Sequence, residues 1–238
     1  MDDETKLGPV KDTRGRIVAV VAIKGGVGKS TIAANAVHRL STLGYRVILV
    51  DCDEPSNRSS TKWVSGALPD VRIEHYRDQH ALWDELPTLR EQADYIIVDS
   101  PGSSDFIRQL LLLADLAVIP TGAGRLETDP LVEAVGLLRQ AQQVRNGPPE
   151  GHVVLSKIGK GRKGNQRILT KQMRDLANNL QMPLAETIVW QSELHPQAAT
   201  DFTFVGEMGR KGRHLAADFE TLFYELFPET KPRMESIG

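Results

Sequence analysis

The chain has 238 residues, of which 40% are hydrophobic and 25% charged, and its formal net charge is −2. This balance is typical of a globular protein, and it argues against binding nucleic acid over the whole surface, so any DNA contact must come from a local basic patch. No apolar run approaches the ~20 residues that span a bilayer, the acidic first four residues do not form a signal peptide, and the single cysteine, Cys52, excludes an internal disulfide and fits a reducing cytosol.

Short apolar runs alternate with helical patterns along most of the chain. The predicted strands are Ile17–Ile23, Val47–Val50, Val71–Glu74, Tyr95–Val98, Leu116–Ile119, Val153–Leu155 and Thr187–Val189. The predicted helices are Thr31–Leu43, Ala81–Arg90, Phe106–Ala114, Leu131–Val144 and Asn165–Leu180, and Asp129-Pro130 supplies an N-cap and first residue for the fourth. Several strands are continuously apolar, as expected when both faces of a parallel sheet are covered. The pattern predicts an α/β fold with a doubly wound, mostly parallel sheet flanked by helices.

The same pattern predicts one domain. Residues 1–15 are expected to form a flexible tail, residues 16–227 a single domain, and residues 228–238 a second flexible tail. The Gly- and Pro-rich segment Asn146–Gly151 is interpreted as a turn rather than a domain linker.

A glycine-rich segment between the first predicted strand and the first predicted helix indicates a phosphate-binding loop. Its backbone N–H groups and the positive end of the helix dipole would face the phosphates, and its glycines would permit close approach and positive φ. In this pattern Lys29 reaches the β- and γ-phosphates, and the Ser30 hydroxyl is a ligand of Mg²⁺. The predicted nucleotide-binding residues are Gly25, Gly26, Val27, Gly28, Lys29, Ser30 and Thr31.

Two apolar strands downstream end in carboxylates. Asp51 and Asp53 follow one strand, and Asp99 follows another. Because ligands of a doubly wound sheet bind at the carboxyl ends of its strands, these side chains are candidates for holding Mg²⁺ and positioning water. The alternative is that they only cap turns, as aspartates at strand ends often do.

The phosphate-binding segment departs from the general P-loop in one respect: Ile23 replaces the usual first glycine and a second lysine, Lys24, follows it. This form resembles the deviant Walker A loop of the ParA/MinD family of ATPases. The resemblance covers about Arg16 to Phe227 and implies a P-loop NTPase fold that uses ATP and Mg²⁺. It also implies that Lys24 crosses a dimer interface to touch the phosphates of the partner's nucleotide.

The resemblance assigns further roles. Asp53 matches the aspartate that orients or deprotonates the attacking water, Asp51 supports the Mg²⁺ shell, and Asp99 matches the Walker B position that holds Mg²⁺ through water. The implied catalytic residues are Lys24, Lys29 and Asp53, and the implied metal site comprises Ser30, Asp51, Asp53 and Asp99. The segment Glu54–Asn57 differs from the family's Pro-Gln-Gly-Asn, and in this switch loop Asn57, Ser59 and Ser60 are candidates for sensing the γ-phosphate.

Other branches of the superfamily fit less well. The last helix carries Asp218, Glu220, Glu225 and Glu229, which disfavours a membrane-binding MinD-like helix. One cysteine cannot supply the cluster ligands of nitrogenase-type iron proteins, the tail has no tyrosines as in bacterial tyrosine kinases, and no Asn-Lys-x-Asp motif indicates a GTPase. A metabolic P-loop synthetase or amidotransferase and a MinD-like membrane-associated positioning ATPase remain the alternatives.

The fifth predicted helix favours the DNA-segregation branch. Leu169, Met173, Leu176 and Leu180 point to one side of it, opposite several basic residues. ParA relatives bind non-specific DNA at about this place and at a second one, although a solvated helix face is the usual meaning of such charges. The candidate DNA-binding residues are Lys160, Arg162, Lys163, Arg167, Lys171, Arg174, Arg210, Lys211 and Arg213.

Together these features predict a ParA-like ATPase. It would dimerise on ATP, bind the nucleoid non-specifically in the cytoplasm without a membrane, and hydrolyse ATP when a centromere-binding or adaptor protein stimulates it. Such a cycle would position or segregate a plasmid, a chromosome or another cargo. The C-terminal residues Leu215, Phe219, Leu222 and Leu226 recur at helical spacing and are predicted to dock on the core.

Overall fold

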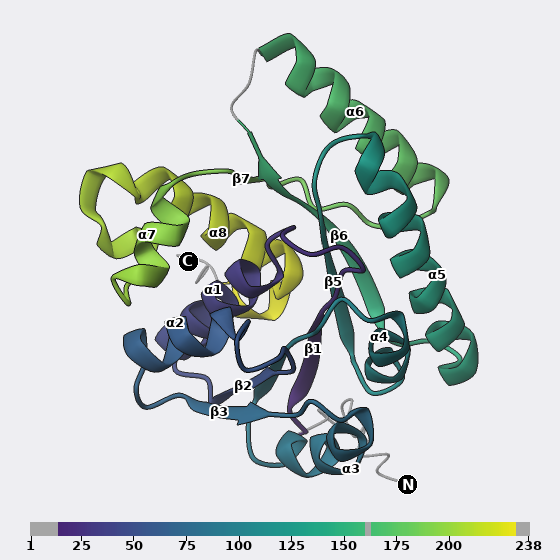
Figure 1. The fold of residues 1–238 in the computed structure, drawn as a ribbon, viewed down its shortest axis with the longest axis vertical. Coiled ribbons are helices and arrows are strands. Elements are labelled where there is room, and N and C mark those ends of the chain that lie inside the picture. The colour runs from purple at the N-terminus through teal and green to yellow at the C-terminus, as the bar shows by residue number, and fades with distance from the viewer. Residues whose placement is uncertain (1–13, 160–162, 232–238) are drawn as a thin grey trace, which may run out of the picture.

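The structure, a computed structural model, describes residues 14–159 and 163–231 (Figure 1). Within them lies one parallel sheet with the strand order β3-β2-β4-β1-β5-β6-β7. The strands are β1 (Arg16–Val20), β2 (Val47–Asp51), β3 (Arg72–His75), β4 (Tyr95–Asp99), β5 (Leu116–Thr121), β6 (Glu150–Ile158) and β7 (Val189–Trp190). Because β1, β2 and β4 are parallel, their carboxyl ends share one edge of the sheet, and the winding direction reverses beside β1.

Helices cover both faces of this sheet. The longer ones are α1 (Lys29–Thr42), α2 (Ser59–Ala67), α3 (Gln79–Arg90), α4 (Ser104–Leu111), α5 (Thr128–Arg145), α6 (Lys163–Asn179), α7 (Leu194–Thr200) and α8 (Arg213–Leu226). Short 3-10 turns are η1 (Arg125–Glu127), η2 (Val205–Glu207), η3 (Gly209–Lys211) and η4 (Pro228–Thr230). Figure 1 shows α1, α2, α7 and α8 on one side of the sheet and α4, α5 and α6 on the other.

The alternation of side chains along β1 explains this two-layer covering. Ile17 and Ala19 pack into the core beneath α3–α6, whereas Val18 and Val20 pack into the core beneath α1, α2, α7 and α8. Successive strand residues point to opposite faces, so a strand covered twice needs an uninterrupted apolar run. The doubly wound, parallel α/β fold is thus confirmed.

Several predicted boundaries are wrong. The first strand ends at Val20 rather than Ile23, because the chain turns there into the glycine-rich loop. Helices α2 and α7 were not predicted, because each buries at most two apolar side chains and so shows no clear helical period, whereas α4, although shorter than α2, buries four. Asp129 and Pro130 are not the N-cap and first residue of α5: the helix begins at Thr128 directly after η1, and Pro130 occupies its third position, where no intrahelical donor is lost.

The C-terminal part of the fold corrects one domain boundary. Leu215, Phe219, Leu222 and Leu226 of α8 are all buried, as predicted. Residues 228–231, which were predicted to begin the second flexible tail, instead pack on the fold, because Thr230 is buried and Glu229 accepts hydrogen bonds from Tyr95 and Arg16. Residues 1–13 and 232–238 lie outside the described part of the chain, so the two tails stay predictions there.

Candidate active site

The turn between β1 and α1 has the backbone of a phosphate cradle. Gly26 and Gly28 have φ of 79° and 99°, and a Cβ on Gly28 would lie 2.5 Å from the Ser156 Oγ, so only glycine fits there. Gly25 was expected to share the positive φ, but it is not among the residues with that conformation. Gly28 is the N-cap of α1 and gives no side-chain cap, which leaves the first N–H groups of the helix open to an anion.

The rest of the predicted loop lies as a phosphate site requires. Val27 is buried beneath the turn, and Lys29, Ser30 and Thr31 form the first turn of α1 with half-buried side chains. The positive charge of Lys29 acts on Asp53, where it lowers a pKa that burial has raised. Lys29 and the carboxylates therefore share one site, at the carboxyl ends of β1, β2 and β4.

Asp51 has a structural role that the sequence did not reveal. Its carboxylate accepts hydrogen bonds from the Asp53 N–H at 3.1 Å, the Ser60 hydroxyl at 2.9 Å, and the N–H and hydroxyl of Thr61 at 3.1 and 2.7 Å. Helix α2 has no side-chain cap of its own at Arg58, so Asp51 caps it from β2. With its lone pairs used in this way, Asp51 is a weaker candidate for magnesium than predicted, and Ser60, buried against it, is not free to sense phosphate.

Asp99 is the opposite case. Its side chain is fully buried at the end of β4, and neither carboxylate oxygen accepts a hydrogen bond of good geometry from a residue that the structure describes. Burial raises the pKa of Asp99 to about 7, although the nearby hydroxyls of Ser30 and Ser60 offset part of that rise. A buried carboxylate without a partner is costly to the fold, which points to a ligand that supplies positive charge.

The geometry of the acidic group fits Mg²⁺. One carboxylate oxygen from each of Asp51, Asp53 and Asp99 can be chosen so that all three lie within 4.8 Å of one another. Among the described residues no other cluster of metal-binding side chains occurs. Oxygen donors are those that Mg²⁺ prefers, and the Ser30 hydroxyl stands beside the unpaired Asp99. Asp99, Ser30 and the half-buried Asp53 are the residues best placed to hold the ion.

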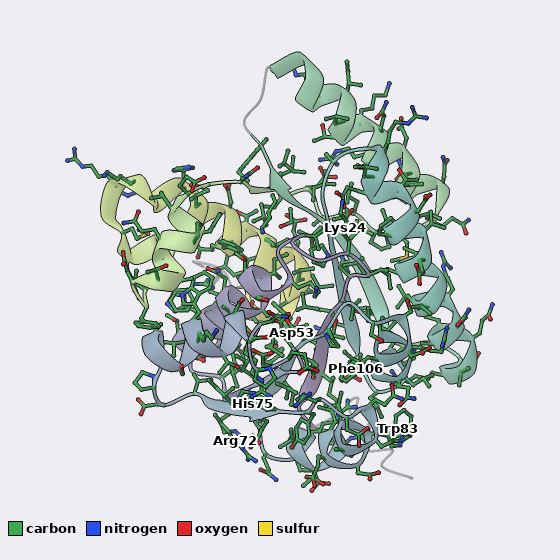
Figure 2. The ribbon with its side chains drawn as sticks, in the orientation of Figure 1. Lys24, Asp53, Arg72, His75, Trp83 and Phe106 are labelled. Atoms are coloured by element: carbon green, nitrogen blue, oxygen red, sulfur yellow. The ribbon has the colours of Figure 1, made fainter. Side chains whose placement is uncertain are left out.

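Lys24 lies on the rim of the site and is paired within its own chain. Its Nζ donates to the Glu127 carboxylate at 2.5 Å, and the two side chains are 38% and 16% exposed. Figure 2 shows Lys24 and Asp53 near the middle of the molecule. Glu127 belongs to η1, 103 positions along the chain, and no local signal in the sequence indicated it.

A pocket of about 370 Å³ continues from the phosphate cradle. It begins at Ser30 and Thr31, and its walls come from α2, the ends of β6 and β7, and α7. The Ser156 hydroxyl in its wall is buried and has no hydrogen-bond partner within residues 14–159 and 163–231. A nucleoside attached to phosphates in the loop would occupy this space. The lining residues that the sequence did not single out include Trp63, Ser156, Lys157, Gln191 and His195.

The predicted DNA-binding residues are spread over two places. On α6, Arg167 and Lys171 are exposed, Met173 is buried on the opposite side, and Arg174 pairs with Glu186 at 3.0 Å. Arg210, Lys211 and Arg213 are exposed around η3 and the start of α8. Lys160 and Arg162 lie outside the described residues, as does the side chain of Lys163.

Comparison with known proteins agrees with this site. The model of the CobQ/CobB/MinD/ParA nucleotide binding domain matches residues 18–202. The chain is 24% identical to the maintenance of carboxysome distribution protein A of Halothiobacillus neapolitanus over 216 residues, 89% of this chain and 96% of that protein. The protein of the same name from Gloeobacter kilaueensis is 26% identical over 216 residues, 89% and 94% of the two chains.

A solved structure shows the same fold. The complex of a Cyanothece McdA variant with ATP superposes with a TM-score of 0.70 at 18% identity, covering 93% of this chain and 99% of that one. No helix in the described part of this chain combines the length and apolar character needed to cross a membrane.

Proposed function

The chain belongs to the CobQ/CobB/MinD/ParA nucleotide-binding family, and from this premise we propose that it is an ATPase that dimerises on ATP, binds DNA non-specifically and positions a cargo. Hydrolysis would be slow until a partner protein stimulates it. The ATPase part rests most on one observation: the buried, unpaired Asp99 beside Ser30 and Asp53, at the mouth of a phosphate cradle.

Each residue of the cradle has a role in this proposal. The N–H groups of α1 and the Lys29 ammonium would bind the phosphates, and Ser30 and Asp99 would hold a magnesium ion. Bound Mg²⁺ neutralises charge on the β- and γ-phosphates. Asp53 orients the attacking water and accepts its proton, for which a carboxylate with a raised pKa in a half-buried position is suited.

Dimerisation depends on Lys24 in this proposal. Its ammonium neutralises a phosphate of the partner's nucleotide, and to do so it exchanges the Glu127 carboxylate for that phosphate. The ion pair of the single chain is therefore the resting state, and the two-nucleotide dimer is the active state. Because the pair is partly exposed, its rupture costs little compared with contact to a triphosphate.

DNA binding is supported by the exposed basic residues on α6 and around η3. A dimer presents these residues twice, so strong binding requires ATP. Since lysine and arginine contact phosphates without reading bases, sequence matters little. The cargo is proposed by analogy: two similar proteins are named for carboxysome distribution, which favours a large cytoplasmic assembly over a plasmid or chromosome, with an adaptor protein as the partner and the nucleoid as the surface.

Light scattering after size exclusion tests the dimer. We expect Mg·ATP to convert the wild-type protein from monomer to dimer, and Lys24→Ala to stay monomeric while still binding ATP. Lys231→Ala, an exposed lysine at the other end of the sheet, is the matched control and should dimerise. A Lys24→Ala protein that dimerises normally would contradict the role proposed for this lysine.

A salt titration on random duplex DNA with ATP, ADP or no nucleotide tests the DNA part. With about six phosphate contacts per dimer, the slope of log affinity against log salt should be near −5 with ATP. Arg167→Glu with Lys171→Glu should remove binding, whereas Arg108→Glu on α4, outside both basic places, should not. Equal affinity for DNA in all three nucleotide states would contradict the proposed ATP-dependent nucleoid binding, and only the proposed ATPase activity would remain.

A further inference from the structure

The start of α2 is fixed by the acidic cluster of the active site. Asp51 accepts hydrogen bonds from Ser60 and Thr61 in the first turn of the helix. The Asp51 carboxylate also lies within 4.8 Å of the carboxylates of Asp53 and Asp99. Because the Asp51 carboxylate caps α2, any movement of Asp51 around a bound nucleotide also moves the first turn of this helix.

One side chain of α2 touches both the nucleoside pocket and a distant segment. Trp63 lines the pocket, and its indole Nε1 donates to the Thr203 carbonyl at 2.7 Å. Its ring stacks on Phe204, with centroids 5.3 Å apart and planes at 20°. The side chain is 4% exposed, so its position is determined by packing on every side.

A second contact holds the same segment against α2. A Cβ on Gly66 would lie 2.2 Å from the Cδ1 of Phe202, which shows how closely that ring covers the helix. Phe202 has φ of 50°, an unusual conformation for a bulky residue, and its side chain is nevertheless 53% exposed. Residues 202–204 therefore contact α2 at two places, where Phe202 covers Gly66 and where Thr203 accepts the hydrogen bond from Trp63.

The same segment leads directly into the basic residues of η3, and it is held by hydrogen bonds and close packing along the way. The Glu207 carboxylate accepts hydrogen bonds from the Thr203 hydroxyl and the Phe204 N–H. A Cβ on Gly212 would lie 1.7 Å from the Val205 carbonyl oxygen, so η3 and the start of α8 pack directly on η2. Arg210, Lys211 and Arg213 flank this contact and are exposed. Figure 1 shows α2, α7 and the start of α8 on the same side of the sheet.

We infer that Trp63 and the segment docked on α2, residues 202–207, couple the nucleotide site to the basic residues Arg210, Lys211 and Arg213, so that ATP sets the position of this part of the DNA-binding surface. The inference rests on the proposed ATP-dependent DNA binding. Physically, α2 is a short rigid element with the active-site carboxylates at one end and the docked segment along its side. A nucleotide that contacts Trp63 or shifts Asp51 biases the packing of residues 202–213.

Gly66→Ala tests the coupling without touching the pocket. The new methyl group displaces Phe202 from α2, whereas Gly136→Ala, the matched control in α5, has no neighbour within 4 Å of its Cβ. Both proteins are titrated with a fluorescent ATP analogue, and amide exchange across residues 203–213 is measured with and without Mg·ATP. Because Gly66→Ala keeps Lys24 and the basic residues of α6, it should retain the part of the ATP effect that comes from dimerisation. With coupling of a usual size, ATP should raise wild-type DNA affinity about fivefold or more beyond the rise that it causes in Gly66→Ala.

In wild type and Gly136→Ala, Mg·ATP should slow amide exchange across residues 203–213, and in Gly66→Ala most of that response should be lost while ATP still binds. Trp63→Phe is the second variant, measured at saturating Mg·ATP: it keeps the stacking on Phe204 but removes the bond to Thr203. It should also lose most of the response, whereas Trp83→Phe on the exposed face of α3 should not.

Three outcomes separate this inference from the proposed function. A full exchange response to ATP in both Gly66→Ala and Trp63→Phe overturns the coupling. Wild-type DNA binding that depends on ATP, without any exchange response at residues 203–213, overturns the coupling and leaves the proposed function intact. An exchange response in a protein that binds no DNA in any nucleotide state supports the coupling and defeats the DNA-binding proposal.

Discussion

Each end of the parallel sheet has an aspartate beside the core, and the two aspartates differ in their hydrogen-bond partners. At the amino end, Asp115 precedes β5 and accepts hydrogen bonds from the Ile17 N–H at 2.8 Å and from the Arg90 guanidinium at 3.0 Å. At the carboxyl end, Asp99 is more deeply buried, and neither of its oxygens has a hydrogen-bond partner in the described part of the chain. Since buried charges are normally paired, the amino end is built for stability and the carboxyl end for a ligand.

The carboxyl end repeats this contrast on a smaller scale. Asp51 and Asp53 are separated by one residue, yet Asp51 is occupied by donors from α2 and Asp53 is half-buried at the site under the influence of Lys29. Asp51 and Asp53 are the same type of residue and lie near the end of the same strand. What separates a structural carboxylate from a chemical one here is the number of donors already bound to it.

The largest expected effect comes from Asp53. Asp53→Ala should lower the rate of ATP hydrolysis by about 10²–10⁴ while Mg·ATP still binds, because it removes the group that orients and deprotonates water. Steady-state phosphate release and equilibrium binding of ATP measure the two properties. Asp51→Ala should instead destabilise the fold through loss of the α2 cap. If Asp53→Ala turns over normally and Asp51→Ala folds but does not, the roles of the two carboxylates are reversed.

An intermediate effect is expected from the pair Asp99 and Asp115. In protein free of metal and nucleotide, Asp115→Asn should cost about 1–2 kcal/mol because it breaks a charged hydrogen bond to Arg90, which lowers Tm by roughly 2–8 °C. Asp99→Asn should not lower Tm at all, since it removes an unpaired buried charge. With ligand, only Asp99→Asn should weaken magnesium-dependent ATP binding. Scanning calorimetry measures Tm of both variants, and titration calorimetry measures their magnesium-dependent ATP binding. A Tm that falls more for Asp99→Asn than for Asp115→Asn would contradict the comparison of the two aspartates.

The smallest effect is expected from a half-buried neutral group, His38. Burial lowers the pKa of His38, which stacks on Phe204 and faces Glu207 and Arg39. The unfolded chain therefore binds a proton at this residue more readily than the folded one, and the stability contributed by neutral His38 is lost as pH falls below the ordinary value of 6.5. His38→Gln should thus destabilise the protein less at pH about 5.5 than at pH about 7.5 in urea melts. A cost that grows on acidification would show that His38 is stabilised in its charged form.

Much of the site could be predicted because its parts are contiguous in sequence. A strand, a glycine turn and a helix place Gly28, Lys29 and Ser30 together wherever the fold puts them, and the strands that lead into Asp53 and Asp99 end at one edge of a parallel sheet. The same locality explains the success with the apolar strands and with the buried face of α8. Helices α2 and α7 were not predicted because each buries at most two apolar side chains, which is too few to show a helical period.

The remaining features depend on pairs that are distant along the chain. The partner of Lys24 is Glu127, and Trp63 meets Thr203, 140 positions further on. Neither pair has a sequence pattern of its own. Likewise the pocket beside the glycine-rich loop is assembled from α1, α2, β6, β7 and α7, so its lining could be identified only once the sheet order was known.

By itself, the sequence determined the fold class, the phosphate loop and the identity of the carboxylates, because hydrophobic period and backbone geometry act between neighbours in the chain. The tertiary structure decided which carboxylates are free. Asp51, Asp53 and Asp99 are chemically identical side chains at strand ends, and only the donors brought to them by folding make Asp51 a helix cap and leave Asp99 unpaired. The energy of a buried charge depends on its partners and its exposure to water, and both are properties of the packed chain rather than of the residue.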